Sequence, residues 1–125
     1  MWDMTGQVVL ITGGTSGIGL AAAELFVAQG AAVMLAGRSA DKGEEAVARL
    51  AEAGGAAAFA RVDVRDEDAV RNLVAETLSE FGGLDVLVNS AGVINRILLT
   101  DLEQPDWDVV IDTNLRGVYL VCKHV

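Results

Sequence analysis

Residues 8–19, VVLITGGTSGIG, join an apolar run, a glycine-rich turn and the start of an alanine-rich stretch. The apolar residues 8–11 predict a buried strand, and residues 18–29 predict a helix. Glycines between a strand and a helix allow a tight turn, which a ligand can approach closely. The free N–H groups and the dipole at the helix start favour an anion there. The run therefore predicts a phosphate-binding turn, with a tight turn that binds no ligand as the alternative.

Short apolar runs alternate with helix-length segments along the rest of the chain. Strands that alternate with helices form parallel β-α-β units, and right-handed crossovers place the helices on both faces of the sheet. The sequence therefore predicts an α/β, Rossmann-like, doubly wound parallel sheet of about four strands, in one domain over residues 1–125. The other expected strands are residues 33–35, 58–62 and 84–88, and the other expected helices are residues 41–53, residues 67–81 and a segment from Pro105 to the C-terminus.

The charge balance and the single cysteine exclude several classes of function. The chain has 18 acidic and 9 basic residues, a net charge of −9, so neither a nucleic acid nor an anionic membrane is expected as a partner. Cys122 alone cannot form an intrachain disulfide, no metal site is expected, and a reducing cytoplasm is the natural compartment. The apolar residues 17–37 are interpreted as a helix and a strand separated by Gly30, not as a membrane span.

The residues after the second expected strand distinguish between two dinucleotides. In an NAD site, an acidic residue about 20 positions after the glycines binds the ribose 2′-OH. Here Arg38 and Ser39 stand at that place, and no acid does. A guanidinium and a hydroxyl can bind a 2′-phosphate through charge-assisted hydrogen bonds, which favours NADP over NAD. The alternative is a solvated arginine, although a cation at a helix start is unfavourable unless an anion lies nearby.

Four short polar or glycine-containing segments occur at intervals along the chain. Residues 12–19 read TGGTSGIG, residues 63–64 read DV, residues 89–92 read NSAG, and residues 114–117 read NLRG. Together they resemble the TGxxxGxG, adenine-contacting Asp, NNAG and helix-Asn motifs of the short-chain dehydrogenase/reductase family, with Ser90 in place of the second Asn. This resemblance covers essentially the whole chain. It implies an NADP-dependent oxidoreductase that transfers hydride between a nicotinamide and a small-molecule carbonyl or alcohol.

The resemblance also implies a role for each matching residue. The glycine turn would line the pyrophosphate, Arg38 would bind the 2′-phosphate, Asp63 would hold the adenine, and the segment from Asn89 would shape the ribose and nicotinamide side. Asn114 matches one member of the family's catalytic tetrad, whereas the family's Ser and YxxxK have no counterpart at the expected positions in these 125 residues. The implied cofactor-binding residues are Gly13, Thr15, Ser16, Gly17, Ile18, Gly19, Arg38, Ser39, Asp63, Val64, Asn89, Ala91 and Gly92.

Residues 119–123, YLVCK, fit YxxxK literally, but they start five positions after Asn114 in the same expected helix. In a regular helix Tyr119 would project about 140° away from Asn114, so the match is interpreted as chance. Tyr119 is expected to pack, and Lys123 to be solvated or at an interface. Further expectations are a buried Cys122, packed Trp2 and Trp107, a surface or capping His124, and an exposed loop Arg96.

Three interpretations of the whole chain stay open on the sequence alone. The first is that the chain is the cofactor-binding half of an oxidoreductase. The second is a dinucleotide-binding or self-associating module without catalysis, and the third is a minimal half-fold. Residues 84–88 would form an apolar edge strand, and the helix from Pro105 would lack part of its packing surface. Both features predict a homo-oligomer.

Overall fold

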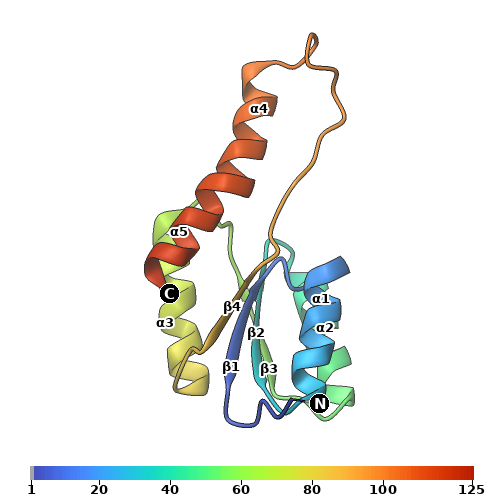
Figure 1. Cartoon of the computed structure of the whole chain (residues 1–125), viewed down its shortest axis with the longest axis vertical. Helices are drawn as coiled ribbons and strands as arrows, with labels where there is room; N and C mark the ends of the chain where they lie inside the picture. Colours follow the sequence, from blue (N-terminus) through green and yellow to red (C-terminus); the bar gives the residue numbers. More distant parts are fainter. Residues whose placement is uncertain (1) are drawn as a thin grey trace.

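The computed structural model describes residues 2–125 as an α/β structure, in which one four-stranded parallel sheet lies between two layers of helices (Figure 1). The strand order is β3-β2-β1-β4, which confirms the expected doubly wound arrangement. The strands are β1 (Val8–Thr12), β2 (Ala32–Gly37), β3 (Ala57–Arg61) and β4 (Val86–Asn89). The helical segments are α1 (Gly17–Ala28), α2 (Ala40–Glu52), α3 (Glu67–Phe81), α4 (Gln104–Ile111), the π-helical segment η1 (Asp112–Arg116) and α5 (Gly117–His124).

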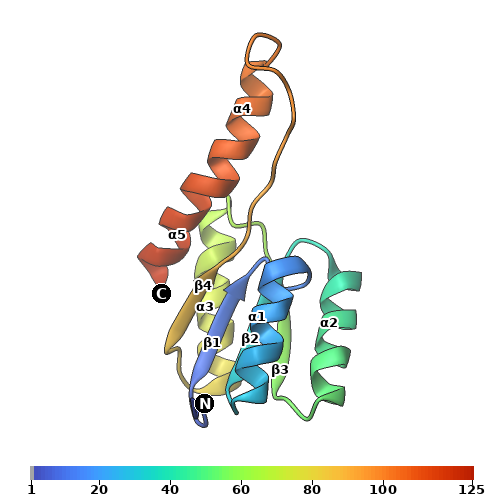
Figure 2. The same cartoon turned by 45° about the vertical axis from the view of Figure 1, so that its right-hand side comes forward.

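The two faces of the sheet carry separate hydrophobic clusters. Successive strand residues point to opposite faces, so Ile11 joins the cluster toward α1 and α2, whereas Leu10 joins the cluster toward α3 and α5. Figure 2 shows α1 and α2 on one side of the sheet and α3 and α5 on the other. All five residues of β1 are buried, because it is a central strand covered on both faces. None of the helices within residues 2–125 has the length and apolar character that a membrane crossing needs.

The ends of α3 coincide with the bounds expected from the sequence. At its start the Asp66 carboxylate accepts hydrogen bonds from the backbone N–H groups of Asp68 and Ala69, at 3.0 and 3.2 Å. At its end Gly82 adopts a left-handed conformation with φ 78°. Gly30 and Gly54 also have positive φ, as expected for helix-terminating glycines.

The last helical region is not the single regular helix expected from Pro105 onward. Pro105 does lie in the first turn of α4, but α4 runs into the π-helical segment η1 before α5 begins. A π turn holds more residues than an α turn, so it rotates the side chains on either side of it relative to each other. The angle of about 140° between Asn114 and Tyr119 assumed regular geometry and therefore does not apply.

Four side chains expected to be packed or buried are instead exposed, so those expectations are wrong. Trp2, Trp107 and Tyr119 are 79%, 54% and 57% exposed, and Cys122 is also exposed. Trp107 lies on α4, which projects beyond the end of the sheet (Figures 1 and 2), so no second layer covers it. An apolar residue on a helix becomes a core residue only where another element packs against that face.

Helix α5 is tied to the start of α3 by one carboxylate. Glu67 accepts a hydrogen bond from the Lys123 ammonium at 2.9 Å, and the His124 ring nitrogen Nε2 lies 2.9 Å from the same oxygen. These two partners lower the pKa of Glu67 from 4.5 to about 2, with the His124 hydrogen bond as the largest cause. Lys123 and His124 therefore act as anchors of the last helix, on the side of the sheet away from α1.

The Glu67→Gln variant should lose an acid-sensitive part of the stability. Because the folded-state pKa of Glu67 is depressed, its contribution is fully present above pH 4.5 and is lost as the pH falls toward 2. We expect the wild-type chain to melt at a higher temperature than the variant at pH 6, and the difference to shrink steadily between pH 5 and pH 2. Circular dichroism melting curves measure it. A difference that is independent of pH would show that the carboxylate charge is not responsible.

Candidate nucleotide-binding site

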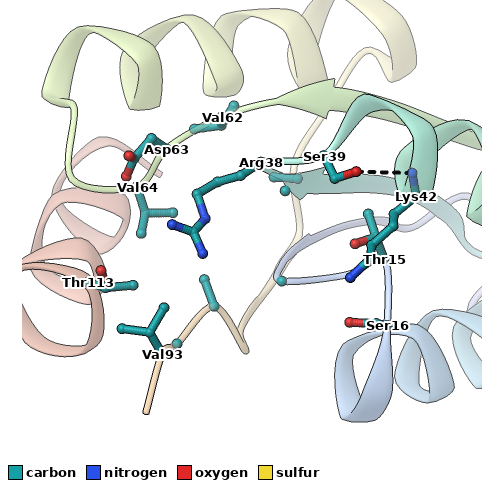
Figure 3. Close-up of a pocket in the computed structure, with 15 residues that line it drawn as sticks. Thr15, Ser16, Arg38, Ser39, Lys42, Val62, Asp63, Val64, Val93 and Thr113 are labelled. Carbon is teal, nitrogen blue, oxygen red and sulfur yellow. Dashed lines mark hydrogen bonds between the residues drawn. The ribbon is translucent and has the colours of Figure 1, made fainter. Parts of the chain in front are cut away.

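A pocket opens at the carboxyl end of the sheet, where the segments after all four strands converge (Figure 3). In open parallel sheets, this edge is where ligands bind. The wall is formed by the glycine turn after β1, the β2–α2 connection, residues 62–64 after β3 and residues 91–93 after β4. Thr113 of η1 completes it. Within residues 2–125, no group of three or more His, Cys, Asp or Glu side chains is placed to hold a metal ion.

Two glycines of the turn region, Gly13 and Gly19, pack too closely against backbone atoms to carry a side chain. The N–H of Gly13 donates to the Ala36 carbonyl at 2.8 Å, which joins the turn to the end of β2. A Cβ on Gly13 would lie 2.6 Å from the Ser90 carbonyl oxygen, and Gly13 has a φ of +64°. A Cβ on Gly19 would collide with the Gly13 carbonyl. The glycines therefore allow β1, α1 and the segment after β4 to meet at one point.

Thr12 connects the glycine turn to the segment after β4. Its hydroxyl oxygen accepts hydrogen bonds from the backbone N–H groups of Ser90 and Ala91, each at 3.3 Å. The same hydroxyl lies 3.5 Å from the Val88 carbonyl, to which it donates. Thr12 is only 1% exposed, so these bonds are shielded from water. The first residue of the TGGTSGIG run thus helps to shape the pocket without lining it.

The start of α1 differs electrostatically from the starts of α2 and α3. Ser39 caps α2 by accepting the Lys42 N–H at 3.3 Å, and both α2 and α3 have acidic residues in their first turn. Ser16, at the start of α1, makes no side-chain capping hydrogen bond, and the first turn of α1 has no acid. The positive end of the α1 dipole is therefore not balanced by nearby side chains, and it adjoins the pocket.

Two cationic side chains line the pocket. In Figure 3 the Arg38 guanidinium extends into the space between Asp63 and Val93, and the Lys42 side chain reaches toward Thr15. Neither cation forms an ion pair with any of the residues that the structure describes. The pocket thus carries an excess of positive charge, although the whole chain is acidic.

Asp63 is held in one orientation by Arg65. The Arg65 guanidinium donates to the Asp63 carboxylate, with a shortest distance of 2.7 Å, and the Arg65 backbone N–H donates to it at 3.0 Å. The hydrogen bond from the Arg65 side chain lowers the pKa of Asp63, partial burial opposes this, and the charge of Arg38 assists it. Asp63 is therefore a fixed acceptor, with the buried side chains of Val62 and Val64 beside it on the pocket wall.

Asn114, on the π-helical segment, holds the segment after β4 from the other side. Its side-chain oxygen accepts the Val93 N–H at 2.8 Å, and its side-chain nitrogen donates to the Val93 carbonyl at 2.9 Å. This double hydrogen bond imitates the pairing of one more strand residue. Asn114 acts through Val93, which lines the pocket, and does not line the pocket itself.

Comparison with known proteins places this arrangement in a family. A family model described as short chain dehydrogenase matches residues 7–125. The chain belongs to the short-chain dehydrogenase family. The family uses NAD(H) or NADP(H), which matches the position of the pocket at the switch point of the sheet.

Individual members of the short-chain dehydrogenase family align along nearly the whole chain. A 3beta-hydroxysteroid dehydrogenase of Mediterraneibacter gnavus is 42% identical over 118 residues, which are 94% of this chain and 43% of that protein. A citronellol catabolism dehydrogenase of Pseudomonas aeruginosa is 40% identical, with a TM-score of 0.92 over 99% of this chain and 50% of its own. An actinorhodin polyketide ketoreductase solved with NADPH is 35% identical, with a TM-score of 0.93 over 99% of this chain and 48% of its own. The chain spans about half the length of these relatives.

The residues predicted from the family's motifs divide into those that lie outside the pocket and those that line it. Asn89 is exposed and donates its amide to the Cys122 sulfur at 3.4 Å, and Gly17 and Ile18 are exposed at the start of α1. Gly19 is buried beneath Gly13. Those that line the pocket are Gly13, Thr15, Ser16, Arg38, Ser39, Asp63, Val64, Ala91 and Gly92.

Several pocket residues have no counterpart in the sequence-based prediction. Lys42 lies in the first turn of α2, three residues after Ser39, and no local sequence signal pointed to it. Val93 directly follows the predicted Gly92, whereas Thr113 is brought in by the fold alone. Thr113 is 6% exposed, and its hydroxyl has no hydrogen-bond partner among residues 2–125. A buried polar atom without a partner is rare in proteins and is consistent with a polar ligand at this wall.

The Asn114→Ala variant should loosen the segment after β4. It removes both hydrogen bonds to Val93, a local loss of about 1–2 kcal/mol. We expect the Val93 amide to exchange with deuterium faster by roughly tenfold, whereas amides of β1 are unchanged. Asn72→Ala, on the exposed face of α3, is the control. Unchanged exchange at Val93 in Asn114→Ala would contradict the assigned role.

Proposed function

We propose that this chain binds NADP(H) and supplies the cofactor-binding part of an oxidoreductase that transfers hydride between the nicotinamide and a carbonyl or alcohol carbon. The observation that carries the proposal is Arg38, which stands at the end of β2 where an NAD site has an acid. Its guanidinium faces the pocket and has no acidic ion-pair partner among the described residues. A 2′-phosphate would balance that charge.

The pocket fits one part of a dinucleotide. Its volume of about 190 Å³ is smaller than the 300 Å³ or more of a typical complete small-molecule site. We assign the adenosine end of the cofactor to it, with Asp63 and Val64 beside the adenine and Arg38 beside the 2′-phosphate. The uncapped start of α1 would bind the diphosphate, close to Gly13. When bound, the nicotinamide supplies or accepts the hydride.

The chain's own contribution to the chemistry is positional. Asn114 fixes Val93, and Thr12 fixes Ser90 and Ala91, so the segment on the nicotinamide side has its backbone held from both ends. Tyr119 and Lys123 do not line the pocket, and Lys123 is engaged with Glu67. We therefore assign proton transfer to residues other than Tyr119 and Lys123. The substrate that we propose for the whole enzyme is a small carbonyl or alcohol compound.

Fluorescence titration with NADPH and NADH tests the proposal directly. We expect saturable binding of NADPH, weaker binding of NADH, and no reduction of carbonyl compounds by these 125 residues. Binding of neither nucleotide would favour the alternative of a self-associating module. Turnover by the isolated chain would refute the assignment of Tyr119 and Lys123 to structural roles.

We also propose that the protein self-associates through the surface around α4. Large apolar side chains are exposed on α4, on η1 and in the segment before α4, among them Leu98, Leu99, Trp107 and Leu115. Such a patch on a projecting helix is typical of a protein interface. We expect Trp107→Glu to shift the mass measured by light scattering toward the monomer. A monomeric wild-type chain at high concentration would contradict this proposal.

A further inference from the structure

The Lys42 side chain occupies a different part of the pocket from Arg38. In Figure 3 the Lys42 ammonium reaches down from α2 to the region of Thr15 and Ser16, whereas the Arg38 guanidinium extends the other way, toward Val93. All five side chains line the same pocket. The two cations therefore stand on opposite sides of one space, and an anion between them would be accessible to both.

The charge of Lys42 is unbalanced in a chain where acids outnumber bases two to one. Glu45 lies one turn further along α2, yet it forms no ion pair with Lys42. Arg38 differs, because its charge helps to lower the pKa of Asp63 and is partly balanced by that carboxylate. The basic side chains that form ion pairs with carboxylates in the described structure are Arg49, Arg65, Arg71, Arg116 and Lys123.

Hydroxyl groups line the part of the pocket into which Lys42 extends. Thr15, Ser16 and Ser39 each contribute one to the pocket wall. Ser39 accepts the backbone N–H of Lys42 at 3.3 Å, which leaves its own hydroxyl proton free to donate. A phosphate monoester carries close to two negative charges at neutral pH and accepts several hydrogen bonds through its oxygens. One ammonium with adjacent hydroxyl donors suits this group better than it suits a neutral ribose hydroxyl.

We propose that Lys42 is a specificity-determining residue for NADP(H), which binds the 2′-phosphate of the adenosine ribose together with Ser39 and Thr15. The inference rests on the proposed function and deepens it. Lys42 lies in the first turn of α2, directly after the β2–α2 connection that holds Arg38 and Ser39, whereas the diphosphate is assigned to the start of α1. Lys42 therefore discriminates between NADP(H) and NAD(H), and does not bind the part that both share.

Binding titrations of the chain with NADPH and NADH distinguish a contact of Lys42 with the 2′-phosphate from a contact with the shared diphosphate. Lys42→Met keeps the length and helix preference of the side chain but removes its charge. We expect it to weaken NADPH binding about tenfold and to change NADH binding by less than about twofold. Lys42→Arg should restore most of the NADPH affinity. Arg71→Met removes the same charge from α3, on the other face of the sheet, and should leave both affinities unchanged.

Each other outcome has a definite meaning. Equal weakening of NADPH and NADH in Lys42→Met would place the ammonium on the shared diphosphate and overturn the inference. Unchanged NADPH binding would overturn it as well. In both cases the proposed function stands, because the wild-type chain still binds NADPH. If the wild-type chain binds neither nucleotide, the proposed function and the inference fail together.

Discussion

Charge reversal at Arg38 should invert the cofactor preference. In Arg38→Glu, NADPH binding is expected to weaken about 100-fold, because charge-assisted hydrogen bonds are lost and a carboxylate faces the 2′-phosphate. NADH binding should hold or improve, since an acid at the end of the second strand binds the ribose 2′-OH in NAD sites. Fluorescence titration of both nucleotides gives the ratio of the two affinities.

The matched control for Arg38→Glu is Arg71→Glu. It changes the net charge by the same amount, but it lies on α3, away from the pocket. Arg71→Glu also loses the exposed ion pairs of Arg71 with Glu67 and Asp68, so circular dichroism checks the folding of both variants. Only Arg38→Glu should change the ratio of affinities. A uniform drop in NADPH affinity in both variants would mean that long-range charge, and not a contact from Arg38, governs binding.

Gly19→Ala should damage stability and nucleotide binding together. The added methyl group would meet the backbone carbonyl of Gly13, and the backbone cannot yield as a flexible side chain does. Overpacking of this kind costs about 3 kcal/mol of unfolding free energy. Because the glycine turn must shift, NADPH and NADH should lose affinity to a similar extent. Urea unfolding and nucleotide titration measure the two effects.

Gly83→Ala is the control for this steric argument. A Cβ at Gly83 would meet no heavy atom within 4 Å, so the same chemical change should leave stability within about 0.5 kcal/mol and binding unaffected. Equal losses in Gly19→Ala and Gly83→Ala would show that the effect comes from backbone flexibility and not from the close approach of α1 to β1.

The sequence predicted those features whose causes are local. The bounds of α3 follow from the Asp66 cap and Gly82, and the turn after β1 follows from its glycines. β4 begins at Val86 and not at residue 84 as expected. The Asp85 N–H still donates to the Val8 carbonyl at 2.9 Å, but the Val8 N–H donates to the Asp85 carboxylate at 2.8 Å and not to a backbone carbonyl. That contact joins residues 77 positions apart, and no local pattern reveals it.

The rest of the site depends on contacts between distant elements. The π-helical segment leaves no recognisable signal in the sequence, yet it carries both Thr113 and Asn114. The exposure of Trp107 follows from the direction in which α4 projects beyond the sheet, which hydrophobicity alone does not specify. The family motifs indicated the pocket, whereas the fold alone added Thr113 to its wall.

The position of β1 between β2 and β4 has a consequence for how the chain reaches its native state. β4 lies beside β1 in the sheet but is the last strand along the chain. The central strand β1 therefore completes its second ladder only after a very long loop has closed. Parallel pairing at this separation is slow compared with formation of the helices. Thr12 meets Ser90 and Ala91 only once that ladder exists. In refolding experiments, we therefore expect nucleotide binding to appear with the slowest phase, well after helical circular dichroism has recovered.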